Sequence, residues 1–246
     1  MNRSTVYAPN GVVAASQPLA AAAGLAVLQQ GHNAFDASVT MAAVLNVVEP
    51  MMTGVGGDMF ALFWCAGEER LVGLNASGRA GSLATRQELL RRGHEKMPST
   101  GAETVTVPGA LRGWEMLLDH YGTISLDEAL QPAIEIADRG FPVSPKLTEL
   151  WWKGMEKLLA IDEGARSTFL FDGKRTPKAG EWIRNPDLAR TLRLIASEGV
   201  DEFYNGEIAE RMVKHLRGLG GFISKGDLAS NTGDWVEPLC VPYHGF

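Results

Sequence analysis

The feature that most constrains the fold is a glycine-rich loop at residues 53–58, between an apolar segment that ends before Pro50 and another that begins at Met59. Glycine has no Cβ, so the glycines at positions 54, 56 and 57 let the backbone take positive φ and approach another chain or a ligand closely. The loop runs from helix into strand, whereas dinucleotide-binding loops run from strand into helix, so phosphate binding is disfavoured. A tight packing turn and a site that binds something else both stay open.

Two apolar helices are predicted before the loop from their end signals. Ser16 is the expected N-cap of the first, with Pro18 in its first turn and Gly31 after its end. This helix is rich in alanine, so another element can pack very close to it, and we expect it to lie in the interior. Asp36 is the expected cap of the second, residues 37–48, which is apolar all round and is therefore predicted to be buried on all sides.

After the loop, residues 59–65 form a continuous apolar run that is rich in aromatic side chains. Such a run predicts a central strand covered on both faces. Residues 66–69 are typical of a hairpin turn, after which residues 71–74 are expected to return antiparallel to the first strand. The first part of the chain therefore predicts a sheet backed by two buried helices, within an α+β fold.

The second half of the chain is predicted to be mostly helical, with polar outer faces and no fixed repeat. Ser125 and Glu128 form a capping-box pattern at the start of one of these helices. The expected helices cover residues 86–92, 110–121, 126–139, 147–159, 185–197 and 208–219. We expect a single large portion over residues 1–246, divided into a helix and sheet core at 1–75, a mostly helical part at 76–232 and the start of a strand region at 233–246.

Composition excludes several classes of function. With 246 residues and 45% hydrophobic residues, the chain can bury a sizeable core. A net charge of −6 without a dense run of Lys and Arg argues against nucleic acid or an anionic membrane as partner. Neither a signal-peptide core nor an apolar stretch of membrane-spanning length occurs, so we expect a soluble, cytoplasmic protein. Cys65 and Cys240 show neither disulfide nor metal spacing and are interpreted as buried thiols.

The sequence contains no recognisable catalytic constellation. The five histidines are scattered, and none stands three or four residues from a second His or Cys, so neither a metal nor another cofactor is expected. No Gly-x-Ser-x-Gly elbow occurs, which leaves a Ser-His-Asp hydrolase unsupported.

Arg79 is the single candidate binding residue. It lies among small residues just beyond a predicted strand end, where a guanidinium can hold a ligand carboxylate by two parallel hydrogen bonds. An ordinary structural ion pair explains an arginine at this position equally well, because such pairs also recruit Arg.

A series of short blocks is distributed along nearly the whole chain. The blocks are VAASQPLA at residues 13–20, GHNAFDA at 31–37, VEP at 48–50, TGVGGD at 53–58, VPGA at 107–110, PAI at 132–134, GFPVS at 140–144, NPDLA at 185–189, FYNG at 203–206 and DLA at 227–229. In these blocks and their order, the chain resembles the N-terminal part of the large subunit in the γ-glutamyltransferase (γ-glutamyltranspeptidase) family of N-terminal-nucleophile hydrolases.

The resemblance implies an αββα sandwich of which this chain is an incomplete part. Members of the family are made as one precursor that cleaves itself, and the new N-terminal Thr of the small subunit becomes the nucleophile, with its own α-amine as base. An acyl group such as γ-glutamyl then passes from an amide like glutathione to water or an amino acid. The resemblance therefore implies no catalytic residue in this chain and a nucleophile Thr downstream of Phe246. It also implies a small-molecule amide substrate and the small subunit of the same precursor as partner, and it allows a higher homo-oligomer.

One segment departs from the family pattern. Family transpeptidases have Arg-Glu followed shortly by Ala-Pro, and that Arg binds the glutamyl α-carboxylate. Here the segment reads Gly78-Arg79-Ala80-Gly81, so the Arg is displaced and the Glu and Pro are absent. Together with Asp58 after the glycine pair, this departure resembles the γ-glutamyltransferase-like branch of acylases and amidohydrolases, so γ-glutamyl, glutaryl and other acyl groups all remain candidates. The comparison also interprets the glycine-rich loop as a tight turn near the active-site cleft that is not itself catalytic.

Two functions of different class stay open. In the first, the chain is part of an amide-cleaving enzyme and is inert until joined to the remainder; half a sheet sandwich then leaves unpaired strand edges and exposed apolar surface. In the second, it is a catalytically inactive binding or scaffold domain, for which a stable, monodisperse monomer is expected.

Overall fold

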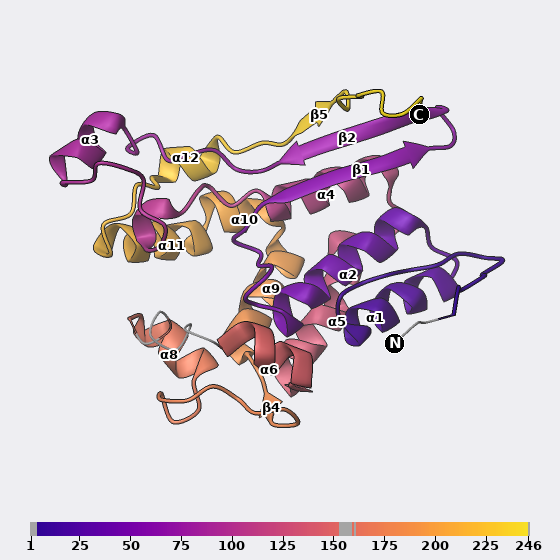
Figure 1. Cartoon of the computed structure of the whole chain (residues 1–246), viewed down its shortest axis with the longest axis horizontal. Helices are drawn as coiled ribbons and strands as arrows, with labels where there is room; N and C mark the ends of the chain where they lie inside the picture. The colour runs from indigo at the N-terminus through magenta and orange to yellow at the C-terminus, as the bar shows by residue number, and fades with distance from the viewer. Residues whose placement is uncertain (1–3, 153–158, 160, 246) are drawn as a thin grey trace. The chain divides into compact units, whose positions relative to one another are not determined.

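The computed structural model describes residues 4–152, 159 and 161–245 of the chain (Figure 1). The chain divides into two compact units, and each is discontinuous in sequence. Unit 1 comprises Met1–Thr53 and Tyr121–Ala196, and unit 2 comprises Gly54–His120 and Ser197–Phe246. The division at 1–75, 76–232 and 233–246 stays a prediction.

Unit 1 is built mainly from helices. They are α1 (Pro18–Gln29), α2 (Ala34–Val48), α5 (Leu126–Arg139), α6 (Pro145–Trp152), α8 (Glu163–Phe169) and most of α9 (Pro186–Glu198). Two short strands, β3 (Phe141–Pro142) and β4 (Trp182–Ile183), pair antiparallel, with Phe141 opposite Ile183.

The N-terminal ends of α1 and α2 differ from the sequence-based prediction. The N-cap of α1 is Gln17, whose side chain accepts a hydrogen bond from the backbone N–H of Leu19, while the Ser16 hydroxyl instead donates to a carboxylate oxygen of Glu49 at 2.6 Å. The predicted place of Pro18 in the first turn is confirmed, since α1 begins at this residue. Helix α2 begins earlier than predicted, because Asn33 rather than Asp36 is its N-cap and Asp36 completes a capping box as the third helical residue.

Helices α1 and α2 pack closely against each other, as their small residues predict. A Cβ added at Gly24 would lie 2.5 Å from the side chain of Met41, so a larger residue would require that side chain to move. Most residues of α2 are buried, as predicted, but burial on all sides is not confirmed, because Ala34 and Ser38 are exposed. The predicted interior position of α1 is wrong for the described structure, because Leu25 and other residues on one side of α1 are exposed.

Asp36 connects α2 to the loop that precedes α5. Its buried carboxylate accepts hydrogen bonds from the backbone N–H of Thr123 at 2.8 Å and from the Thr123 hydroxyl at 2.7 Å, and a longer one from the N–H of Ile124. Burial by itself would raise the pKa of Asp36, but the hydrogen bonds from Thr123 and neighbouring backbone groups outweigh it and lower the pKa below its usual value. The ionised carboxylate therefore holds two distant segments of unit 1 together.

Unit 2 combines a sheet with helices. Its elements are β1 (Met59–Cys65), β2 (Arg70–Ala76), α3 (Arg86–Arg91), the 3-10 turn η1 (Ala102–Thr104), α4 (Ala110–Tyr121, its last residue in unit 1), α10 (Val200–Asn205), α11 (Glu207–Gly218), α12 (Lys225–Ala229) and β5 (Asp234–Val236). The strands lie in the order β1-β2-β5 and are all antiparallel (Figure 1). The predicted hairpin is confirmed, with Met59 opposite Ala76 and Cys65 opposite Arg70.

Only one face of this sheet is covered in the described structure. On that face Val72, Leu74 and Ala76 of β2 are buried, and α4 approaches so closely that a Cβ at Gly113 would lie 2.5 Å from the sulfur of Met59. On the opposite face the exposed large side chains of β1 are Phe60, Leu62 and Trp64, which are 70%, 65% and 61% exposed. The prediction of a central strand covered on both faces is therefore wrong here: β1 is an edge strand. A continuous apolar run in the sequence does not indicate which face of the strand is covered by other parts of the same chain.

Most predicted helices in the second half are confirmed. Helices α4 and α5 have the predicted bounds, α3 ends one residue early, and α9 and α11 differ by one residue at each end. Of the helix predicted at residues 147–159, α6 accounts for the part up to Trp152, and residues 153–158 lie outside the described residues. The short helices α8, α10 and α12 were not predicted. Each has seven or fewer residues, too few for a clear helical period.

Both cysteines differ from the prediction of buried thiols. Cys65 is partly exposed at the end of the edge strand β1, and Cys240 is exposed beyond β5. Within the residues that the structure describes, no helix is long and apolar enough to cross a membrane.

Candidate functional site

The glycine-rich loop supports the start of α4. Within the loop the N–H of Gly57 donates to the carbonyl of Gly54 at 2.8 Å, and the carbonyl of Gly57 accepts the N–H groups of Gly109 and Ala110, both at 2.9 Å. The first N–H groups of a helix lack partners within it, so Gly57 satisfies donors at the N-terminal end of α4. The three loop glycines have negative φ, and a Cβ at Gly56 would meet nothing within 4 Å. These contacts are those of a packing turn; a direct contact between the loop and a ligand stays untested.

The segment that carries Arg79 is held against residues 107–109 by backbone contacts. A Cβ at Gly78 would lie 1.4 Å from the carbonyl oxygen of Val107, and one at Gly109 would lie 2.0 Å from the carbonyl oxygen of Ala76. The N–H of Val107 donates to the carbonyl of Arg79 at 2.9 Å. Only glycine fits at positions 78 and 109, so these two residues permit the close approach of the two segments.

Tyr204 of α10 holds the segment at residues 107–109 in place. Its buried hydroxyl donates to the carbonyl of Pro108 at 2.9 Å and accepts the backbone N–H of Arg112 at 3.2 Å. The side-chain amide of Asn231 also donates to the carbonyl of Pro108, at 3.1 Å. Burial raises the pKa of Tyr204 to about 12, so the phenol stays protonated and able to donate at neutral pH. The backbone around Arg79 therefore rests on a network that reaches α4, α10 and the segment before β5.

The side chain of Arg79 reaches into solvent from this rigid backbone. It is 81% exposed, and its guanidinium lies 4.0 Å from the carboxylate of Asp234 in β5. An ion pair at this distance between exposed groups contributes little to stability, because water screens both charges. The ordinary ion pair considered for Arg79 therefore exists but is weak, and the guanidinium has donors left with which to hold a carboxylate.

Asp234 is the member of this site that sequence reasoning missed. It lies opposite Asn75 in the register of β2 and β5, and the Asn75 side chain accepts hydrogen bonds from the N–H and hydroxyl of Ser77. Asp234 and Arg79 are far apart in the sequence, and a local pattern carries no signal for a pairing of distant strands. In the described part of the chain, no group of three or more His, Cys, Asp and Glu residues is placed to hold a metal ion.

Comparison with known proteins finds one family over most of the chain. The family model described as Gamma-glutamyltranspeptidase matches residues 20–246. The chain is 37% identical to the "Glutathione hydrolase-like YwrD proenzyme" of Bacillus subtilis (strain 168), in a match that covers 100% of this chain and 46% of that relative. The chain spans less than half of the length of the curated relatives that it matches.

Solved structures agree in fold over nearly the whole chain. The cephalosporin acylase from Bacillus halodurans is 41% identical with a TM-score of 0.93, over 100% of this chain and 46% of that chain. The Helicobacter pylori gamma-glutamyltranspeptidase is 32% identical with a TM-score of 0.92, over 99% of this chain and 70% of that chain. The predicted α+β, N-terminal-nucleophile hydrolase fold class is thereby confirmed. The chain belongs to the gamma-glutamyltranspeptidase family.

Proposed function

We propose that the chain is part of an autoprocessed amidohydrolase or acyltransferase, which passes a γ-glutamyl or related acyl group from an amide donor to water or an amino acid. The observation that carries this proposal is the family match over residues 20–246. Similar proteins are described as a glutathione hydrolase-like proenzyme and a cephalosporin acylase, names that fit a hydrolase or acyltransferase.

The nucleophile in this proposal is the N-terminal Thr of a small subunit downstream of Phe246. Two observations support it: more than half of the length of the curated relatives lies outside the matched part, and the relatives are described as proenzymes. The α-amine of such a Thr removes the proton from its own hydroxyl, and backbone N–H groups then stabilise the oxyanion. The 246 residues alone are inactive under this proposal.

The exposed face of β1 is the surface that the small subunit covers in this proposal. Phe60, Leu62 and Trp64 project from alternate positions of an edge strand, with Leu71 of β2 and Val236 of β5 exposed near them in the same sheet. Large contiguous apolar surfaces and unpaired strand edges are seldom left open to water, because burying them is favourable and leaving them open invites aggregation. This surface also argues against the alternative of an independent, catalytically inactive binding or scaffold domain.

Arg79 binds the carboxylate of the acyl donor in this proposal. Its exposed guanidinium stands on a backbone held by Gly78 and Val107, and the carboxylate of Asp234, which would compete with a ligand for it, is 4.0 Å away. A fixed backbone limits the entropy lost when the side chain closes on a ligand, and a guanidinium matches a carboxylate by two parallel hydrogen bonds.

The experiment compares Arg79→Ala with the wild type in the processed enzyme, using acyl donors with and without a free carboxylate. We expect the Michaelis constant for carboxylate-bearing donors to rise about tenfold or more, as for a lost charged hydrogen bond, with little change for uncharged donors. Arg86→Ala, at the start of α3, is the matched control and should leave the Michaelis constants for both donor classes unchanged. Equal effects of Arg79→Ala on both donor classes would show that Arg79 is structural.

A further inference from the structure

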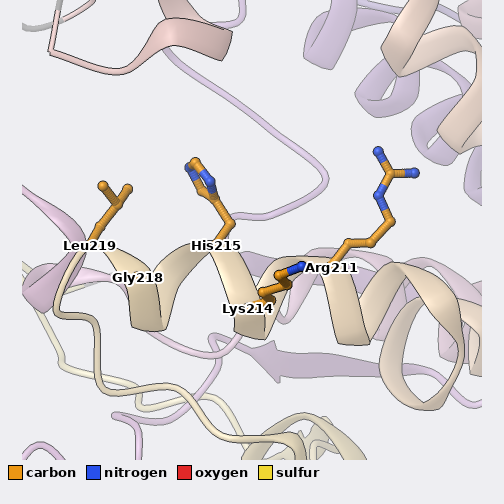
Figure 2. A pocket seen from close by; sticks show the side chains of 5 residues that line it. All are labelled: Arg211, Lys214, His215, Gly218 and Leu219. Atoms are coloured by element: carbon orange, nitrogen blue, oxygen red, sulfur yellow. The ribbon is translucent and has the colours of Figure 1, made fainter.

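A hollow beside α11 is bordered, among the residues that the structure describes, by one face of this helix (Figure 2). The bordering residues belong to α11 or to its C-cap and are Arg211, Lys214, His215, Gly218 and Leu219. Residues on one face of a single helix enclose nothing by themselves, so they define no binding site. Chemical reactivity of a different kind lies in two Asn-Gly sequences.

The chain contains the dipeptide Asn-Gly twice, at residues 10–11 and 205–206. In this dipeptide the backbone nitrogen of glycine can attack the side-chain amide carbon of asparagine, because glycine has no Cβ that shields the nitrogen and it allows backbone conformations that other residues rarely take. The attack requires a glycine N–H that is not held in a hydrogen bond and a backbone that can turn toward the side chain. Two Asn-Gly sequences in different local structures should therefore react at different rates.

The first Asn-Gly sequence is open to this reaction. Asn10 and Gly11 are exposed and lie outside any helix or strand, in the segment before α1. In the part of the chain that the structure describes, neither the Asn10 side chain nor the N–H of Gly11 takes part in a hydrogen bond. A Cβ at Gly11 would lie 3.4 Å from the side chain of Leu28 in α1, a contact that leaves the amide unengaged.

The second Asn-Gly sequence is held by its local structure. Asn205 is the last residue of α10, and the N–H of Gly206 donates to the carbonyl of Glu202 at 3.0 Å. The Glu202 carboxylate accepts the next N–H, that of Glu207, at 2.6 Å. The Gly206 nitrogen can attack only after this helix end has opened, and such local opening costs free energy.

We propose that Asn10 is a site of spontaneous deamidation in the folded protein and that the helix end protects Asn205. The Gly11 nitrogen forms a bond to Cγ of Asn10, the bond from Cγ to Nδ2 breaks, and ammonia leaves with the proton of the Gly11 N–H. Water then opens the resulting succinimide ring. Cleavage of the bond from nitrogen to Cγ gives aspartate, and cleavage of the bond from nitrogen to the main-chain carbonyl carbon gives isoaspartate. Nothing is oxidised or reduced.

The product changes both charge and main chain. Either product carries one more negative charge than asparagine, and isoaspartate also lengthens the main chain by one methylene group. Because Gly11 lies against Leu28, the longer chain alters how this segment approaches α1. Nothing in this proposal depends on acyl transfer.

Deamidation is measured on the purified, folded protein, incubated at neutral and at mildly alkaline pH. Digestion with pepsin in acid, where ring closure is slow, is followed by mass spectrometry of the peptides that contain each asparagine. Asn10 should be converted about tenfold or more faster than Asn205, because Asn205 reacts only while its helix end is open. The Asn10 rate should rise with pH, since the attacking nitrogen must lose its proton. Equal rates at the two positions would overturn the proposal.

The same incubation in guanidinium chloride removes the structural difference. There the Asn205 rate should rise about tenfold or more and approach the Asn10 rate, which should change little. An equal rise at both positions would show that the fold protects Asn10 as well and would refute the proposal. Asn10→Gln, in which the five-membered ring cannot form, should remove the product from the peptide that contains residue 10. A product that persisted in this variant would contradict the assignment to Asn10.

Discussion

The hydroxyl of Tyr204 donates a hydrogen bond of 2.9 Å to the carbonyl of Pro108, two residues that the sequence separates widely. The bond is buried, and it fixes the segment that lies against the backbone of Gly78 and Arg79. A side chain of α10 therefore sets the position of the candidate binding residue without approaching a ligand itself.

Tyr204→Phe should lower the free energy of unfolding by about 1–2 kcal/mol. The substitution keeps the ring but removes the donor to Pro108 and the acceptor of the Arg112 N–H, which leaves that part-buried N–H without this partner. Urea denaturation measures the change. Tyr243→Phe, at an exposed tyrosine, is the control and should be neutral. A neutral Tyr204→Phe would mean that water or the Asn231 amide replaces the lost bonds.

Asp36→Asn should destabilise the protein by about 2 kcal/mol at neutral pH, because an amide cannot accept all the hydrogen bonds that the buried carboxylate accepts from the Thr123 region. The pKa of Asp36 is lowered in the folded state, so its stabilisation is complete above the unfolded-state value, near 3.8, and is lost as the pH falls through the lower folded-state value.

The difference between wild type and Asp36→Asn should therefore shrink as the pH falls below about 3.8. Thermal unfolding across a pH series measures it, with the exposed Asp119→Asn as control. A difference that stays constant down to the lowest pH would contradict the assigned role of the ionised carboxylate.

Gly78→Ala should destabilise the protein strongly and Gly56→Ala should hardly affect its stability, although both substitutions add one methyl group. The Cβ at position 78 would overlap the carbonyl oxygen of Val107, so we expect a loss of about 3 kcal/mol or more, or failure to fold. At position 56 the Cβ meets nothing within 4 Å and φ is not positive, so stability should change by less than about 0.5 kcal/mol. Chemical denaturation compares them. If Gly56→Ala kept its stability but lost enzyme activity, the loop would contact a ligand directly.

Leu62→Asp should prevent the proposed small subunit from associating. Leu62 is already exposed in this chain, so the charge costs little here, but it would be buried unpaired once the face of β1 is covered. Size-exclusion chromatography of the processed full-length protein measures whether both subunits elute together. Leu25→Asp, at an exposed leucine of α1, is the control and should not affect association. Co-elution in both variants would exclude this face as the contact.

Local signals in the sequence were sufficient for much of the fold. Helix α5 begins after the Ser125 capping box and ends before Gly140, and α4 follows Gly109, as the sequence predicts. These signals work because a cap or a glycine acts on backbone groups within a few residues of itself. They fail by a few residues where two residues that can each cap a helix stand close together, as with Asn33 and Asp36 at α2.

The short blocks were likewise sufficient for the family, because they lie in order along one chain. The small residues beyond a predicted strand end singled out Arg79 as a candidate. Only the tertiary structure decided that Asp234 lies near Arg79 and that Tyr204 holds Pro108. It also decided that Phe60, Leu62 and Trp64 face solvent while β2 buries its apolar side chains against α4. Each of these relations joins residues that are distant in sequence, or depends on which face of an apolar strand the chain itself covers. Residue type and spacing do not determine contacts between distant residues or the covered face of a strand, because these depend on how separate elements pack.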